Sequence, residues 1–287
     1  MDKKYLFINN PISGGGKNNF IKIFESFKDK FPQHKIINTT YSGHAKALAA
    51  QYKNEFDIIV AVGGDGTINE IASALVTTNT AMGIIPRGSG NGFALHLGVS
   101  LKLPLALEQL LKGTPKPTDA ITANNQLFVN IAGVGFDGHI ARLFNQTKLR
   151  GFWSYAKLVF TEYSRYKEYE YRLTIEKKVY KGSAFIIAFA NTTQYGNNFR
   201  IAPNAIADDG LLHITLVKKP PFIMLPYFIY LIVSGKAIKS SYCTELTGSK
   251  ITLHSSAIAC HLDGEVYEGL TEQLDFKVLK GALKVIY

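Results

Sequence analysis

Residues 57–70 read DIIVAVGGDGTINE, and this stretch decides the fold class of the N-terminal part of the chain. Residues 57–62 are apolar almost throughout, which is typical of a strand covered on both faces in a parallel sheet. The glycine-rich run at 63–66 ends the strand, and residues 68–76 have the apolar spacing of a helix. A glycine-rich turn between a buried strand and a helix lies where open α/β sheets bind their ligands.

The alternation of strand and helix continues on both sides of this turn. Because helices follow the strands in turn, the sequence predicts a doubly wound α/β domain with a parallel sheet. The strands are predicted at 5–9, 35–39, 57–62 and 81–85, and the helices at 20–27, 45–52 and 68–76.

The pattern changes near residue 115, because residues 112–117 (KGTPKP) have the composition of a linker. Strand-like runs dominate beyond it, which predicts a β-rich, sandwich-like domain. We therefore expect an α/β domain over residues 1–117 and a β-rich domain over 118–287, with the last residues packing back on the first domain. The later strands are predicted at 126–131, 169–175, 184–190, 211–217, 250–253 and 274–279, and the later helices at 153–163 and 222–233.

The composition is that of a basic globular protein. The 287 residues carry a formal net charge of +10, and 46% of them are hydrophobic. Such a charge favours nucleic acid, anionic lipid or nucleotide phosphates as partners, or is merely a basic surface. The lysines and arginines are scattered and form no block typical of a nucleic-acid tail, so we expect no nucleic-acid partner.

Three features predict a cytoplasmic protein. The two cysteines, Cys243 and Cys260, form neither a disulfide scaffold nor a CxxC zinc motif. The N-terminus lacks the apolar segment of a signal peptide. The most apolar stretch, 222–233, contains Pro226 and is shorter than the roughly 20 residues of a spanning helix. It is either a core or crossover helix or a patch that touches lipid.

The turn after residue 62 has the chemistry of a phosphate site. Glycines let the backbone approach phosphate oxygens, and the N–H groups at a helix start point towards an anion. Asp65 could orient a metal-bound phosphate, while Thr67 and Asn69 could donate hydrogen bonds. The alternative is a tight strand-to-helix turn in which Asp65 caps the helix.

Two other glycine-rich loops follow predicted strands. Residues 86–94 read PRGSGNGFA, and loops after successive strands can meet at one crevice. Ser89 and Asn91 could bind phosphate or ribose there, and Arg87 either neutralises phosphate charge or is solvated. Residues 14–17 read GGGK but lack the spacing of a P-loop, so they form either a phosphate contact or a turn.

The GGDGTINE stretch and the PxGSGN-FA segment together resemble the diacylglycerol kinase catalytic family, which includes bacterial lipid kinases, sphingosine kinases and ceramide kinases. The resemblance runs through almost the whole chain. It implies a nucleotide-binding α/β domain, a β-rich lipid domain, and a transferase of phospholipid metabolism that uses ATP and Mg²⁺. The nucleotide contacts that it implies are Thr39, Gly63, Gly64, Asp65, Gly66, Thr67, Asn69 and Ser89.

Four further segments support the resemblance. Residues 39–45 (TTYSGHA) resemble a T-x3-GHA stretch in which the threonine, here Thr39, helps to bind ATP. Residues 130–137 (NIAGVGFD) resemble the N-x3-G-GFD segment of the family.

The third segment, residues 202–212 (APNAIADDGLL), resembles a stretch that holds a structural magnesium ion in bacterial members. The match implies the carboxylate of Asp209 and the carbonyls of Ile206 and Leu211 as ligands, and such oxygen ligands suit Mg²⁺. The alternative is a turn at 208–210 that only reverses the chain.

Residues 261–265 (HLDGE) resemble the family element that supplies the catalytic base, here Glu265. A positioned carboxylate can accept the proton of a lipid hydroxyl as that hydroxyl attacks the γ-phosphate. Asp263 would support Glu265 or the metal. Taken alone, Asp-Gly-Glu is a common hairpin turn. The resemblance thus implies Glu265 and Asp65 as the catalytic residues.

One position departs from the family pattern. Gly92 stands where many bacterial diacylglycerol kinases have an aspartate, and the Ser-Gly-Asn wording at 89–91 is nearer to sphingosine and ceramide kinases. The lipid therefore stays open among diacylglycerol, a sphingoid base, ceramide and undecaprenol-like alcohols. The metal contact that the aspartate would make stays open as well.

Two other functions compete with a lipid kinase. NAD kinases share GGDGT, but they continue with a hydrophobic-Leu pair and carry a TPTGSTAY-like loop, whereas this chain has Ile68-Asn69-Glu70 and later DGE. A non-catalytic lipid-binding homologue would keep the fold alone. We expect an ATP-dependent lipid kinase that contacts the membrane surface peripherally through its basic charge.

Overall fold

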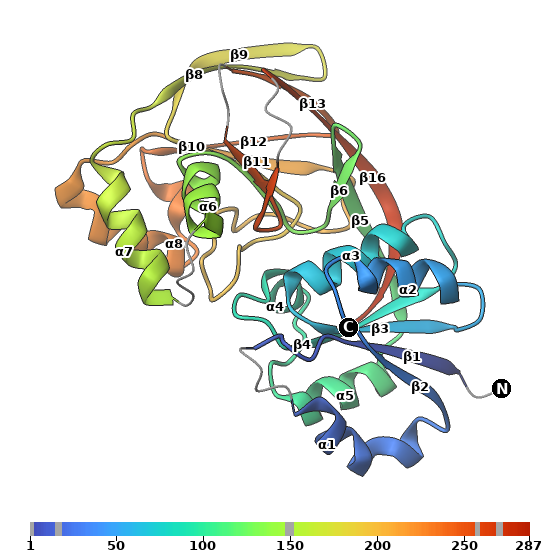
Figure 1. Ribbon diagram of the computed structural model, residues 1–287. Coiled ribbons are helices and arrows are strands. Elements are labelled where there is room, and N and C mark those ends of the chain that lie inside the picture. The colour runs from blue at the N-terminus through green and yellow to red at the C-terminus, as the bar shows by residue number, and fades with distance from the viewer. Residues whose placement is uncertain (1–2, 15–18, 147–151, 256–258, 268–271) are drawn as a thin grey trace. The chain divides into compact units, whose positions relative to one another are not determined.

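The computed structural model describes residues 3–14, 19–146, 152–255, 259–267 and 272–287 (Figure 1). The chain divides into two compact units. The first consists of Met1–Ala120 with Lys280–Tyr287, and the second of Ile121–Leu279. We call them the α/β unit and the β unit. Among the described residues, none of the helices has both the length and the apolar character needed to cross a membrane.

The α/β unit contains a parallel sheet with the strand order β2-β1-β3-β4. The end of the last strand of the chain joins it, because Val285 pairs in parallel with Met82 of β4. The strands are β1 (Lys4–Asn9), β2 (Gln33–Asn38), β3 (Ile58–Gly63) and β4 (Ala81–Pro86). The helices are α1 (Phe20–Phe24), the 3₁₀ helix η1 (Glu25–Lys30), α2 (His44–Tyr52), α3 (Asp65–Leu75), α4 (Gly92–His96) and α5 (Leu103–Lys112).

Helices cover both faces of this sheet, with α2 and α3 on one face and α1 and α5 on the other (Figure 1). Every residue of β3 is buried, as the apolar run predicts for a central parallel strand. An aromatic cluster fills the side of α1, where the ring of Phe7 lies 4.8 Å from that of Phe24 and 5.3 Å from that of Phe31. The prediction of a doubly wound α/β domain is confirmed.

The β unit contains an antiparallel sheet in the order β12-β11-β10-β7-β14-β15. Its strands are β7 (Ile131–Gly135), β10 (Ile186–Ala190), β11 (Leu212–Val217), β12 (Cys243–Gly248), β14 (Cys260–Leu262) and β15 (Glu265–Tyr267). A second layer of strands runs β16-β13-β8-β9, with β5 paired to β16 and β6 paired to β5. These strands are β5 (Pro115–Ala123), β6 (Gln126–Phe128), β8 (Tyr169–Ile175), β9 (Lys178–Ala184), β13 (Lys250–His254) and β16 (Gln273–Ile286).

The main core of the β unit lies between its two strand layers. Phe189 of β10 stacks on Phe276 of β16 with ring centroids 4.0 Å apart, and both side chains are buried. Ile214 on one layer and Leu173 and Leu253 on the other belong to the same buried cluster. This arrangement confirms the prediction of a β-rich, sandwich-like domain.

Helices pack on the outer face of the antiparallel sheet of the β unit. They are α6 (Phe136–Gln146), α7 (Phe152–Tyr163), the 3₁₀ helix η2 (Phe222–Met224), α8 (Leu225–Val233) and the 3₁₀ helix η3 (Ala237–Lys239). Phe136, Tyr163 and Leu225 bring α6, α7 and α8 into one buried cluster. Phe228 and Ile232 of α8 pack with Ile131 and Ala188 of the sheet.

The structure contains elements that the sequence analysis does not predict, among them α4, α5, β9 and β12. Three further differences concern β5, α6 and β16. The predicted linker is strand β5 from residue 115 onwards, where two prolines mask the strand signal. The helix α6 is absent from the prediction because Gly138 interrupts its apolar pattern. A Cβ at Gly138 would overlap the backbone of Ala259, so the packing requires glycine there. The last predicted strand, 274–279, is the middle of the 14-residue β16.

Candidate active site

Two glycine-rich loops meet at the carboxyl end of the parallel sheet, where β3 and β4 end at Gly63 and Pro86. A Cβ added to Gly64 would lie 2.9 Å from the Cα of Gly88. The N–H of Arg87 donates to the carbonyl of Gly63 at 2.7 Å. The structure therefore brings together the two loops that the sequence singles out, at a spacing that only glycine allows.

The helix α3 begins directly in the first of these loops. Gly64 is the N-cap residue and makes no side-chain cap, while Asp65 is the first helical residue. Asp65 therefore does not occupy the N-cap position that the alternative interpretation assigns to it. The amides of the first turn, which includes Gly66, have no partner within the helix and can bind an anion. A carboxylate beside them can hold a metal ion that accompanies phosphates.

Residues that follow β1 and β2 lie at the same end of the sheet. The side-chain amide of Asn10 donates to the hydroxyl of Thr67 at 3.1 Å, and Thr67 is buried. The N–H of Thr39, which is half-buried, donates to the carbonyl of Asn9 at 2.9 Å. The sequence did not single out Asn10, although its position directly after a predicted strand is the signal that would have found it.

The end of the GGDGTINE stretch has a structural task. The carboxylate of Glu70 accepts the N–H groups of Gly43 at 2.9 Å and Ala45 at 3.0 Å, at the start of α2. It thereby binds the segment that follows Thr39 to helix α3. Asn69 accepts the hydroxyl of Ser73 at 3.4 Å. In the sequence, Glu70 stands out only as part of the motif, because no local pattern indicates its contact with a residue 27 positions away.

The second loop is shaped by Asn91, which has a positive φ of 51°. Its side chain accepts the N–H of Gly88 and donates to the carbonyl of the same residue, both at 2.8 Å. Asn91 is buried, whereas Ser89 at the loop tip is exposed. Of the two predicted polar ligands, Ser89 is therefore the one that faces solvent, and Asn91 holds the loop. Gly92 is buried at the start of α4.

The loop after β1 approaches the same region. A Cβ on Gly14, whose φ is +68°, would lie 2.8 Å from the carbonyl oxygen of Arg87. The guanidinium of Arg87 donates to the side-chain oxygen of Asn19 at 3.2 Å. The remainder of the proposed phosphate loop, 15–17, lies outside the described residues.

In the β unit, Glu265 is the first residue of β15 and is exposed. The turn before it is fixed by Asp263, whose φ is 51°. The carboxylate of Asp263 accepts the N–H groups of Val129, Asn130 and Ile131 at 2.9, 2.8 and 3.1 Å. Asp263 therefore acts as a brace for the hairpin that carries Glu265. A carboxylate with three backbone donors is well satisfied without a metal ion.

A buried ion pair holds the other side of the same hairpin. The Nε2 of His261 lies 2.8 Å from Oδ2 of Asp137, which stands near the start of α6. The Nδ1 of His261 accepts the N–H of Gly264 at 3.2 Å. A Cβ at Gly133 would overlap both members of the pair. These contacts explain why the 130–137 and 261–265 segments each carry a glycine and an ionisable residue.

The pKa values of the pair reflect its burial and its charges. Burial alone raises the pKa of Asp137, but the charge and hydrogen bond of His261, together with a hydrogen bond from Tyr195, lower it overall. Burial alone lowers the pKa of His261, but Asp137 and then Asp263 raise it overall. Each partner thus stabilises the charged form of the other.

The predicted magnesium ligands lie on the loop that leads into β11. The Oδ1 of Asp209 accepts the N–H of Leu211 at 2.8 Å, and its Oδ2 lies 3.2 Å from Nε2 of His213. His213 in turn lies 3.7 Å from Glu245. Within the described ranges, no group of three or more His, Cys, Asp or Glu residues could hold a metal. A site here would use one carboxylate and the carbonyls of Ile206 and Leu211, a set of oxygens that fits Mg²⁺.

Two family models match consecutive parts of the chain. Residues 4–123 match the diacylglycerol kinase catalytic domain. Residues 130–287 match the YegS C-terminal NAD kinase beta sandwich-like domain. The two models together cover nearly the whole chain.

Curated relatives and solved structures agree with this match. A probable lipid kinase YegS-like protein of Pseudomonas savastanoi pv. phaseolicola is 31% identical over 84% of this chain and 77% of its own length. The diacylglycerol kinase of Bacillus subtilis is 26% identical over 93% of this chain and 91% of its own. A putative diacylglycerol kinase from Bacillus anthracis superposes with a TM-score of 0.78 at 26% identity, over 99% of this chain and 97% of that one.

Proposed function

Because the chain belongs to the family of YegS-like lipid kinases and diacylglycerol kinases, we propose that it transfers the γ-phosphate of ATP to a hydroxyl group of a membrane lipid. The observation that carries this proposal is the contact of the loops at Gly64 and Gly88. It gathers backbone N–H groups and a helix start at the end of the sheet where α/β folds bind ligands.

We assign the nucleotide to the α/β unit. Backbone amides of Gly63, Gly64, Gly66 and Thr67 bind the phosphates, and Thr39, Asn69 and Ser89 add polar contacts. Asp65 would hold the metal ion that accompanies the phosphates. Mg²⁺ bound with the nucleotide would neutralise charge on the phosphate oxygens.

Glu265 is assigned as the general base. Its carboxylate takes the proton of the lipid hydroxyl while the hydroxyl oxygen forms a bond to the γ-phosphorus. The bond from that phosphorus to the bridging oxygen breaks, and ADP leaves with the electron pair. The hydrogen bonds of the hairpin support this role, because Asp263 ties the turn to Val129 and His261 accepts the N–H of Gly264, next to Glu265. A turn held in this way limits the positions that the exposed carboxylate of Glu265 can take.

A radiolabelled ATP assay against a lipid panel tests the proposal. The panel contains diacylglycerol, a sphingoid base, ceramide and a polyprenol, each dispersed in detergent with Mg²⁺. Glu265→Gln should lower kcat by about a hundredfold or more, as for a lost general base. Asp65→Ala should abolish turnover. Glu272→Gln, an exposed carboxylate of the same unit, is the matched control and should retain activity. Equal turnover by Glu265→Gln and the parent chain would refute the assignment of the base.

NAD kinase is the second candidate function, because the C-terminal family model is described as NAD kinase beta sandwich-like. ADP release is measured with NAD and with dispersed diacylglycerol in parallel. Turnover of NAD alone would replace the proposed function. Turnover of neither NAD nor any lipid in the panel would favour a non-catalytic lipid-binding homologue.

The magnesium site at Asp209 is a separate part of the proposal. We expect Mg²⁺ to raise the melting temperature of the parent protein and to leave that of Asp209→Asn unchanged. Asp208→Asn is the control, because Asp208 directly precedes Asp209 on the same loop and is exposed. Equal Mg²⁺ shifts in the parent and in Asp209→Asn would remove the site. We also expect a cytoplasmic enzyme that binds membranes peripherally.

A further inference from the structure

Exposed apolar side chains of the β unit gather around helix α8. Ile223 is 86% exposed and Phe222 is 61% exposed, although both are large hydrophobic residues. Single exposed apolar residues are ordinary, but a group of them on neighbouring elements, here α7, η2 and α8, marks an interaction surface. We call this group the α8 face. Its members are Phe160, Phe222, Ile223, Met224, Tyr227, Tyr230 and Val233.

The opposite side of the same helix is firmly packed. Leu225, Phe228, Leu231 and Ile232 are buried. The helix has no charged residue, so it is apolar on its buried and exposed sides alike. An apolar helix that is half exposed in water is costly unless another phase covers it. Tyrosines at its exposed positions have the amphipathic character favoured at a membrane interface.

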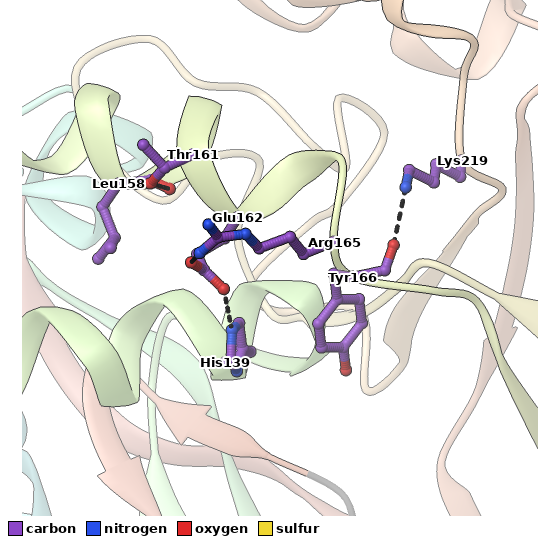
Figure 2. A network of polar contacts seen from close by, with 7 residues as sticks. All are labelled: His139, Leu158, Thr161, Glu162, Arg165, Tyr166 and Lys219. Atoms are coloured by element: carbon purple, nitrogen blue, oxygen red, sulfur yellow. Dashed lines mark hydrogen bonds and ion pairs between the residues drawn. The ribbon is translucent and has the colours of Figure 1, made fainter.

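Polar contacts join the neighbouring helix α7 to α6 (Figure 2). Glu162 of α7 lies 3.1 Å from His139 of α6 and 3.5 Å from Arg165. The ring of Phe160, two residues before Glu162 on α7, lies 6.5 Å from the ring of Phe222. Glu162 is the one acidic residue in the sequence of α7, and its charge is balanced by these partners.

The segment of the sequence that contains α8 carries charge of a single sign. Between Asp209 and Glu245 the sequence contains four lysines and no acidic residue. Lys219 is occupied, since its Nζ donates to the carbonyl of Tyr166 at 2.7 Å (Figure 2). The other three, Lys218, Lys236 and Lys239, are exposed. Exposed lysines beside an exposed apolar helix are complementary to an anionic lipid surface.

A cavity of about 460 Å³ opens between the α8 face and two of these lysines. One wall is apolar and aromatic, and the other carries ammonium and hydroxyl groups. That combination fits a lipid phosphate with the first part of its chains. The lining residues are Met224, Tyr227, Phe228, Leu231, Lys236, Lys239, Ser240, Ser241 and Tyr242.

We propose that the α8 face docks on an anionic phospholipid bilayer, with a lipid phosphate held by Lys236 and Lys239 in this cavity. The proposal deepens the proposed function, since it identifies the surface through which the kinase reaches its membrane, but docking itself needs no catalysis. A second copy of the chain fits less well, because a two-fold interface would bring the same lysines face to face.

Vesicle sedimentation with the full-length protein tests the docking surface. Vesicles contain phosphatidylcholine alone or with phosphatidylglycerol, at low and at high salt. We expect binding only to the anionic vesicles, and weaker binding at high salt. Ile223→Ser/Tyr227→Ser should lose most of that binding. Val179→Ser on the exposed strand β9 is the matched apolar control and should bind like the parent.

The lysines are tested separately. Lys236→Gln/Lys239→Gln should bind anionic vesicles about thirtyfold more weakly, at about a factor of five per lysine. Lys178→Gln/Lys181→Gln on β9 makes the same change of net charge and should have a much smaller effect. Equal losses in both lysine pairs would mean that net charge alone attracts the protein, which would overturn the proposal.

The outcome is distinguishable from that of the kinase assay. Turnover of lipid in detergent micelles should be unchanged in the α8-face variants, because micelles bring the substrate without a bilayer. If the protein shows no kinase activity but its vesicle binding still depends on the α8 face, the proposed function is wrong and the docking proposal stands. Unchanged vesicle binding by Ile223→Ser/Tyr227→Ser, or a dimer that these substitutions dissociate in light scattering, would overturn the docking proposal.

Discussion

At the scale of single residues, the candidate site depends on positions where a side chain cannot fit. Gly64 and Gly88 touch backbone to backbone, so neither loop can yield by moving a flexible side-chain end. Gly133 leaves space for a buried ion pair in the same way. The glycines of the motifs therefore act in packing as much as in backbone freedom.

The first prediction concerns Gly64→Ala. The added methyl group must push the two loops apart, because its contact at 2.9 Å is with the Cα of Gly88. We expect the free energy of unfolding to fall by about 1–3 kcal/mol, as at other overpacked sites. We also expect kcat/KM for ATP to fall more than it does in the control variant. Urea unfolding and steady-state kinetics measure the two effects. The control is Gly182→Ala on β9, where the nearest atom is a tyrosine hydroxyl at 3.2 Å. ATP kinetics in Gly64→Ala equal to those of the control would contradict the assignment of this turn to phosphate.

The second prediction concerns the pH dependence of the pair Asp137–His261. The lowered pKa of Asp137 gives a contribution to stability that is present above its ordinary 3.8 and lost as pH falls through the folded value. The raised pKa of His261 gives a contribution that is full below its ordinary 6.5 and lost as pH rises through the folded value. The coupling is therefore largest in weakly acidic solution.

A double-mutant cycle with Asp137→Asn and His261→Gln checks this sign. We expect a coupling free energy of about 2 kcal/mol at its maximum, typical of a buried charge pair in contact. It should decline as the pH is raised from near 5.5 towards 9, with the free energy measured by urea unfolding. A coupling that grows with pH would show that the imidazole is neutral in the folded protein. The kcat of the same variants shows whether the pair also positions Glu265, the proposed base.

At the scale of elements, the start of helix α2 is completed by another helix. Its N-cap is Gly43, which has no side chain to offer the free amides. Glu70 of α3 accepts those amides instead and adds a negative charge at the positive end of α2. The contact also fixes the segment that begins at Thr39.

The third prediction follows from this contact. Glu70→Gln should lower the free energy of unfolding by about 1–2 kcal/mol, because one neutral oxygen replaces two charged acceptors. The KM for ATP should rise while kcat changes less, if Thr39 contacts the nucleotide. Glu55→Gln, exposed after α2, changes the net charge equally and should have no effect. Equal stability of the two variants would show that the contact adds nothing.

At the scale of the whole molecule, the chain order and the compact units do not coincide. The last residues, 280–287, belong to the α/β unit, although the preceding 159 residues form the β unit. Strand β16 contributes to both, since Phe276 lies in the core of the β unit and Val285 pairs with β4. The N-terminal unit is therefore incomplete without the C-terminal end of the chain.

The fourth prediction tests this dependence. Val285 is fully buried, so Val285→Ala should destabilise the α/β unit by about 2 kcal/mol through the cavity it leaves. Hydrogen exchange should become faster at the amides of β4, more than 190 residues earlier in the chain by number. Lys277→Ala, exposed on the same strand, is the control. Unchanged exchange at β4 in Val285→Ala would show that the last residues only rest on the unit.

The sequence by itself determined the two fold classes, the alternation of strands and helices that makes a parallel sheet, and the loops that carry the glycines. These features are local, since periodicity and turn chemistry act within about a dozen residues. Helix α6 and strand β5 were not predicted from the sequence. The glycine at 138 and the prolines at 115 and 117 disfavour these elements locally, and tertiary packing overrides that preference.

Only the tertiary structure decided which motif residues touch each other. In the structure, Asp137 contacts His261, which is 124 positions away, and Glu70 accepts a hydrogen bond at the start of helix α2. Residues 280–287 belong to the first unit. Such contacts arise from the burial of apolar surface by elements distant in the chain, and that burial leaves no periodic trace around either partner. A motif therefore shows that a charge is needed, and the packed fold shows which backbone or side chain it serves.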